Sequence, residues 1–138
     1  MSILRRRVAI VTDSSTDLKP AMIEELGVEV APVVVRVDDE DVALTPEMAV
    51  GPFFDRMAQP HRASTSGVNV AGWLEALQRA RERADTVIAL PLAAKMSMSV
   101  QTLQMAIDML KEELHDRVYV TAVDSQNVAC GLNALVVN

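Results

Sequence analysis

The amino-acid sequence predicts an α/β fold, with a mainly parallel sheet and helices on both faces. Four short segments rich in Val and Ile alternate with amphipathic helical patterns along the chain. These segments are almost continuously apolar, which is typical of strands that helices cover on both sides. Alternation of strands and helices favours right-handed crossovers within one sheet. With 138 residues, half of them hydrophobic, the chain is expected to form a single domain.

The strands and the first helix follow from apolar runs and from capping residues. We expect strands at residues 8–12, 28–37, 86–92 and 118–123. Asp17 is expected to cap a first helix over residues 18–26. Pro20 fits the first turn of this helix, and Gly27 is expected to end it.

The second helix is poorly defined by the sequence, whereas the third is well defined. Residues 45–47 are expected to open the second helix, which the Gly-Pro pair at 51–52 must break or restart. Asn69 is expected to cap the third, because apolar residues recur at helical spacing over residues 70–84.

The last two helices carry more apolar surface than one face requires. A fourth helix is expected over about residues 98–114, and we interpret its methionines as core rather than as a ligand-lining stripe. A last helix follows Ser125, and residues 126–138 contain no charge. Such a helix needs burial on most sides, so we expect a truncated domain or a missing partner. An exposed methionine stripe could also support a dimer. The methionines concerned are Met96, Met98, Met105 and Met109.

Charge and cysteine content limit the classes of partner. Thirteen Lys and Arg against nineteen Asp and Glu give a net charge of −6, which disfavours nucleic acid and anionic membranes. The single cysteine, Cys130, excludes an internal disulfide and suits a reducing compartment. No apolar run approaches the roughly 20 residues of a membrane span. We therefore expect a cytoplasmic protein.

Hydroxyl-bearing residues follow three of the predicted strands. They lie within residues 12–17, 95–99 and 124–125, and a loop at 64–66 before the third helix adds more. Ligands of parallel sheets bind at the carboxyl ends of the strands, where helix N-termini point their free N–H groups. Hydroxyls suit a carboxylate or a phosphate, although Ser, Thr and Asp are also ordinary helix caps. Asp13 could hold a metal or act as a nucleophile, but we favour a role in fixing its turn.

Signatures of catalysis and of metal binding are absent from the sequence. There is no phosphate-binding glycine loop, dinucleotide fingerprint or nucleophile elbow. His61 and His115 are the only histidines, and a dipole contact is the simpler role for His115. The acidic residues 38–41 read as a solvated turn rather than a calcium site, and Cys130 as a small packed side chain. We expect no enzyme activity, no metal and no cofactor.

Four motifs occur in an order that characterises one protein family. Residues 11–18 read V-T-D-S-S-T-D-L, and residues 65–66 read T-S. Residues 88–102 are similar to a strand followed by L-S-x-x-L-S-G-T-Y-x-S-A, and residues 123–131 to V-x-D-S-x-x-x-x-x-G. Together they resemble the DegV family of fatty-acid-binding proteins. Residues 1–138 would then form a DegV-like first domain, without the second domain of a typical member.

This resemblance implies a site and a function. It implies that Thr65 and Ser97 hydrogen-bond the carboxylate of a long-chain fatty acid, and we expect Asp13, Ser14 and Ser125 to shape the site. The acyl chain would run toward the second domain. The resemblance also implies a carrier that presents the fatty acid to a separate fatty acid kinase.

The sequence departs from the family pattern around the implied site. Gly67-Val68-Asn69 stands where the family has Q-P-S, and Lys95 and Met98 stand where it has small residues. Lys95 could therefore add charge to the bound anion.

Two other functions stay open from the sequence. One is a phosphotransfer enzyme or subunit related to the dihydroxyacetone kinase fold, which would need His61 as its nucleophile. The other is a structural fragment that binds no ligand.

Overall fold

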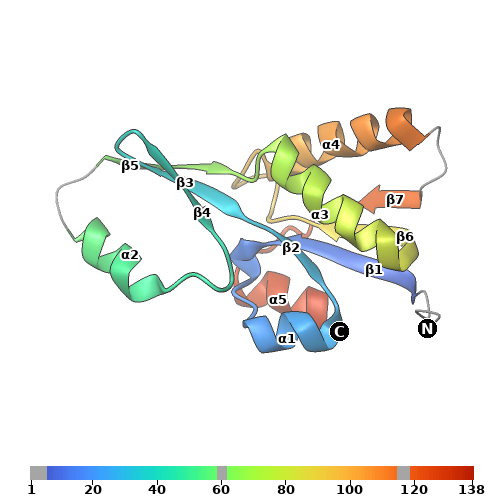
Figure 1. Ribbon diagram of the computed structural model, residues 1–138, viewed down its shortest axis with the longest axis horizontal. Helices are drawn as coiled ribbons and strands as arrows, with labels where there is room; N and C mark the ends of the chain where they lie inside the picture. Colours follow the sequence, from blue (N-terminus) through green and yellow to red (C-terminus); the bar gives the residue numbers. More distant parts are fainter. Residues whose placement is uncertain (1–5, 59–61, 115–118) are drawn as a thin grey trace.

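The computed structural model describes residues 6–58, 62–114 and 119–138. A four-stranded parallel sheet has the order β2-β1-β6-β7, which confirms the predicted α/β class (Figure 1). Its strands are β1 (Arg6–Asp13), β2 (Glu29–Ala31), β6 (Ala84–Leu90) and β7 (Tyr119–Ala122).

Helices cover both faces of this sheet, as the sequence predicts. In Figure 1, α3 and α4 lie on one face, and α1 and α5 lie on the other. No helix among the described residues is both long enough and apolar enough to cross a bilayer. The helical segments are η1 (Ser14–Thr16), α1 (Pro20–Leu26), α2 (Val50–Met57), α3 (Val70–Arg83), α4 (Ser99–Leu114) and α5 (Cys130–Val137).

A second sheet, which the sequence does not predict, projects from the first as an antiparallel arm (Figure 1). Its strands, in the order β4-β3-β5, are β3 (Val33–Val37), β4 (Glu40–Leu44) and β5 (Ala63–Gly67). The expected single strand over residues 28–37 is therefore wrong. It divides at Pro32, which lacks the N–H needed to continue a ladder, into β2 in one sheet and β3 in the other.

Two hydrophobic clusters fill the space between the sheet and its helices. The larger one joins α3 and α4 to the parallel sheet around Trp73, Leu77 and Leu103, all fully buried. The smaller one packs Leu18 and Leu132 under the opposite face. Burial of each such side chain contributes roughly 1.5–3 kcal/mol, so these clusters fix the strand ends that carry the site.

Several helix boundaries differ from those expected. Asp17 does not cap α1, because it adopts a left-handed conformation (φ 54°) at the end of η1, and Lys19 precedes the helix instead. Gly27 ends α1 in a left-handed conformation, as predicted. Helix α2 begins at Val50, so Pro52 lies in its first turn, where no intrahelical N–H bond is lost.

The later elements also correct details of the sequence interpretation. Asn69 caps α3 as expected, but Ala84 already belongs to β6. Helix α5 begins only at Cys130, which is exposed rather than packed. The four methionines expected in the core, Met96, Met98, Met105 and Met109, are exposed, because Leu103, Ala106, Ile107 and Leu110 supply the buried face of α4.

Candidate functional site

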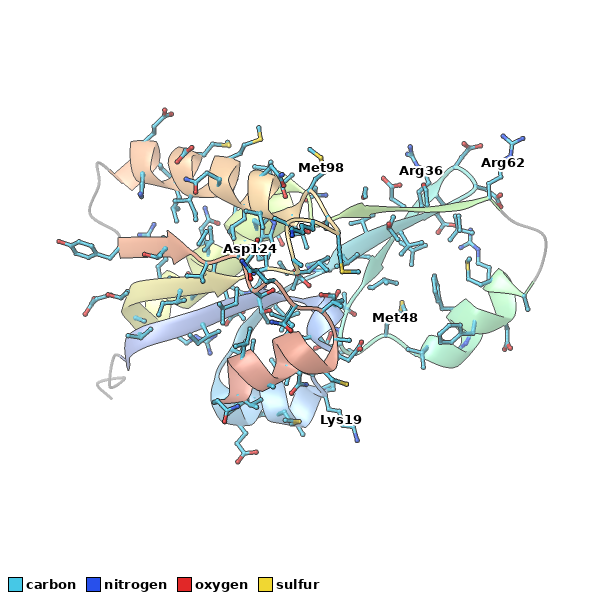
Figure 2. All side chains as sticks on the ribbon, turned by 180° about the vertical axis from the view of Figure 1, so that it is seen from behind. Lys19, Arg36, Met48, Arg62, Met98 and Asp124 are labelled. Atoms are coloured by element: carbon cyan, nitrogen blue, oxygen red, sulfur yellow. The ribbon has the colours of Figure 1, made fainter. Side chains whose placement is uncertain are left out.

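A cavity of about 460 Å³ lies where the two sheets meet, beside the start of α4. Figure 2 shows Met98, just before α4, at the upper edge of the molecule, and Asp124, just after β7, closer to its centre. Thr65 and Ser97, the two residues implied by the family motifs, both line this cavity. The full lining comprises Ser15, Val33, Thr65, Ser66, Gly67, Leu92, Ala94, Lys95, Met96, Ser97, Met98, Gln101 and Val128.

Thr65 reaches the cavity from a strand rather than from the loop that the sequence suggests. It lies on β5, opposite Val35 of β3, next to a register shift between Val34 and Val35. Its side chain is exposed. Among the described residues, no hydrogen bond occupies the Thr65 hydroxyl, so it is available to a ligand.

Ser97 is held by the first turn of α4. Its hydroxyl oxygen accepts a hydrogen bond from the Ser99 amide (3.1 Å) and lies 2.8 Å from the Ser99 hydroxyl. Ser99 is fully buried, and its own oxygen accepts from the Val68 amide at 3.4 Å. If the Ser99 hydroxyl is the donor in this pair, the Ser97 hydroxyl is free to donate a hydrogen bond to an anion in the cavity. The positive end of the α4 dipole favours such an anion.

Gly67 allows β5 to approach this pair of serines. It has φ +68°, and a Cβ at this position would lie 2.8 Å from the Ser97 hydroxyl oxygen and 3.0 Å from that of Ser99. Both the backbone conformation and the space therefore require glycine. The sequence marks Gly67 only as a departure from the family pattern and does not reveal this role.

Replacing Gly67 by Ala is expected to destabilise the fold by about 1–3 kcal/mol, through the positive φ and the contact with Ser97. Gly51 offers a matched control, because nothing lies within 4 Å of a Cβ placed there in α2. Gly51→Ala is expected to be neutral or stabilising by up to about 1 kcal/mol. Urea denaturation measures both, and equal effects of the two substitutions would refute the close approach.

Asp13 fixes the turns around the cavity without lining it. The carboxylate is fully buried at the end of β1, and it accepts hydrogen bonds from the Leu92 amide (2.7 Å) and the Ser15 amide (3.0 Å). The Ser15 hydroxyl also donates to it. This network agrees with the turn-fixing role favoured from the sequence. Burial raises the pKa of Asp13 above 3.8, although the hydrogen bonds from Ser15 and Leu92 act in the opposite direction.

The raised pKa of Asp13 predicts a pH dependence of stability. The folded state binds the proton more tightly than the unfolded state does, so the contribution of Asp13 is greatest below pH 3.8 and falls as pH rises through the folded-state pKa. We expect the unfolding free energy of wild type minus that of Asp13→Asn to decrease as pH rises from 3.8 through the folded-state pKa. Denaturation at a series of pH values measures it, and a rising difference would contradict the assignment.

Ser14 and Ser125 also lie outside the cavity and act on the backbone around it. The Ser14 hydroxyl accepts from the Val33 amide at 2.9 Å, which joins η1 to the start of β3. Ser125 bonds the backbone of Asn127 through its hydroxyl, within the loop that carries Val128 to the cavity. Their expected role in shaping the site stays a prediction.

The charge of the cavity wall is positive. Lys95 is the only charged residue among the described residues that line it, and no acidic side chain does so. Exposed Met96 and Met98 add apolar surface beside the hydroxyls. The wall can therefore solvate an anionic oxygen on one side and contact an apolar group on the other.

Other candidate chemistry finds little support in the described part of the chain. His61 and His115 lie outside the described residues, so the phosphotransfer hypothesis is untested. Of the acidic residues expected to form one turn, Asp38 and Asp39 form the turn between β3 and β4, whereas Glu40 and Asp41 are the first residues of β4. No group of three His, Cys, Asp or Glu residues that could hold a metal occurs within the described ranges.

Together, the fold and the cavity define a class of protein: a parallel α/β domain with a hydroxyl-lined, cationic cavity near the carboxyl ends of its strands. The chain belongs to the DegV family. The family model described as "Uncharacterised protein, DegV family" matches residues 7–138.

Curated relatives agree with this assignment. A DegV domain-containing protein of Deinococcus radiodurans is 33% identical over 129 residues, covering 91% of this chain and 43% of that protein. The corresponding protein TTE1491 of Caldanaerobacter subterraneus is 25% identical over 130 residues, covering 94% of this chain and 45% of that protein. The chain thus spans less than half the length of these relatives.

Solved structures of other proteins share the fold. A DegV family protein from Thermus thermophilus, described by its fatty acid binding, superposes with a TM-score of 0.79 at 26% identity, covering 96% of this chain and 45% of that one. The Fak B3 protein of Streptococcus pneumoniae, loaded with linoleic acid, gives a TM-score of 0.76 at 17% identity, covering 95% and 46%.

Proposed function

We propose that this chain binds a long-chain fatty acid by its carboxylate in the cavity between Thr65 and Ser97. The observation that carries the proposal is that these two hydroxyls, separated by 32 positions, line one cavity together with Lys95 and no described acidic residue. Membership of the DegV family and the fatty acid binding of the Thermus thermophilus protein support it.

The proposed site divides affinity from selectivity. Each buried methylene of an acyl chain contributes roughly 0.8 kcal/mol, so the tail supplies most of the binding free energy. A carboxylate left without donors costs several kcal/mol, so the hydroxyls determine which head group is accepted. Apolar surface at Leu92, Met98 and Val128 offers contacts for the first part of the tail.

The biological role that we propose is that of a carrier. Residues 1–138 would act as the domain that binds the head group. A second domain would cover more of the tail, since the relatives are more than twice as long as the matched region. The Fak B3 neighbour supports presentation of the fatty acid to a separate kinase, and we expect this to take place in the cytoplasm. The chain itself would perform no bond chemistry.

Native mass spectrometry of the chain incubated with oleate tests the proposal. We expect one oleate per chain, displaced by excess linoleate. The 138-residue chain contains all the residues named above as lining the cavity, so the head-group site can be tested on it directly. Absence of a complex at oleate concentrations up to its solubility limit, with the chain folded by circular dichroism, would refute the proposed function.

A further inference from the structure

Lys95 is the one charged residue among the described cavity lining, and no described partner neutralises it. The ion pairs found among the described residues lie elsewhere. They are Arg36–Asp41, Arg56–Glu40, Arg79–Glu29, Arg79–Glu75 and Arg83–Glu29. An unpaired ammonium at the wall of a cavity can therefore neutralise a bound anion at no cost in existing ion pairs.

The turn that carries Lys95 is fixed by hydrogen bonds on both sides. The Ala94 amide donates to Asp124 (3.1 Å), and the Ala93 amide donates to the Asn127 carbonyl (3.0 Å). The Met96 and Ser97 amides both donate to the Ala93 carbonyl, which closes the turn. The side chain of Lys95 is therefore attached to a backbone position that these hydrogen bonds hold in place, two residues before Ser97. The Asp124 carboxylate accepts hydrogen bonds from the backbone amides of Ala94 and Gln126, and it makes no ion pair with Lys95.

The chemistry of the lining groups separates two functions. A serine or threonine hydroxyl both donates and accepts, so Thr65 and Ser97 can serve an alcohol or an ester as well as a carboxylate. An ammonium has three donors and no acceptor, and it gains Coulomb energy only from an anion. The hydroxyls alone thus give weak discrimination between charged and neutral head groups.

Building on the proposed function, we propose that Lys95 makes this cavity selective for the ionised acid over the alcohol or ester of the same chain. Its ammonium pairs with the carboxylate held by Ser97 and Thr65. Because Lys95 is exposed, solvent screens this pair, and its removal weakens binding by about fivefold to tenfold rather than abolishing it.

The test compares two ligands that share one tail. Binding of radiolabelled oleate and oleyl alcohol is measured on the full chain for wild type and for Lys95→Met, Lys95→Arg and Lys111→Met. Lys111 lies in the last turn of α4 and outside the cavity lining, so its replacement controls for net charge. We expect Lys95→Met to weaken oleate binding by about fivefold to tenfold and to leave oleyl alcohol within about twofold. Lys95→Arg and Lys111→Met should both bind oleate like wild type.

Salt provides an independent readout. Oleate binding by wild type should weaken as sodium chloride is raised, and this dependence should be smaller in Lys95→Met. Equal loss for oleate and oleyl alcohol, or equal loss in Lys111→Met, would overturn the role of Lys95 while leaving the proposed function intact. Failure of wild type to bind either ligand would instead overturn the proposed function, and the role of Lys95 with it.

Discussion

Ser97→Ala is expected to weaken oleate binding by about 10-fold to 100-fold, because it removes a hydrogen bond to a charged group, worth about 1.5–3 kcal/mol. The loss should exceed that of any other single hydroxyl in the cavity. Ser97 lies at the positive end of the α4 dipole. Its hydrogen bonds with Ser99 can orient the Ser97 hydroxyl so that it donates to the ligand. Titration of the variant with oleate measures the effect.

Two further variants separate recognition from general loss of structure. Thr65→Val keeps the shape of the side chain and should weaken binding by about 10-fold, for the same reason. Ser64→Ala changes a neighbouring exposed hydroxyl of β5 that does not line the cavity, so it should bind oleate normally. Weakening by Ser64→Ala equal to that by Thr65→Val would contradict the assignment. Ser97→Ala should also be checked for folding, since Ser97 accepts from the Ser99 amide.

Asp13→Ala is expected to lower the free energy of unfolding by about 3 kcal/mol. It leaves the buried Leu92 amide and the partly buried Ser15 amide without their acceptor, and each such loss costs about 1–3 kcal/mol. These two amides belong to the turns after β6 and β1, so both walls of the site loosen together. Guanidinium denaturation at neutral pH measures the change.

Asp124→Ala is the matched control for this prediction. Asp124 also accepts from two backbone amides, those of Ala94 and Gln126, but its side chain is exposed. Water can replace its hydrogen bonds, so we expect a loss of about 1 kcal/mol or less. If Asp124→Ala destabilises the chain as much as Asp13→Ala does, burial is not the source of the Asp13 effect.

The parallel sheet and its helices could be predicted because local signals agree with tertiary packing. Continuous apolar runs predict β1, β6 and β7, and the capping residue Asn69 predicts where α3 begins. The antiparallel arm could not be predicted in this way. Its strand β5 reads Ala-Ser-Thr-Ser-Gly and is exposed at four of its five positions, so neither hydrophobicity nor alternation distinguishes it from a loop.

Part of the site could likewise be predicted from the sequence. The family motifs identified Thr65 and Ser97, and the fold brings both to one cavity. The role of Gly67 could not be predicted, because it depends on a distance between β5 and α4 that arises only in the folded chain. The methionines were misassigned because Leu103, Ala106, Ile107 and Leu110 already supply the buried face of α4.

A crystal structure of the chain with oleate tests the central claim most directly. The account predicts an elongated ligand whose carboxylate lies within hydrogen-bond distance, about 3 Å, of the hydroxyl oxygens of Thr65 and Ser97. A second cavity, of about 540 Å³ and lined by Leu18, Phe53 and Phe54, offers an alternative apolar location. Oleate bound there, with the hydroxyls of Thr65 and Ser97 facing only water, would contradict the account.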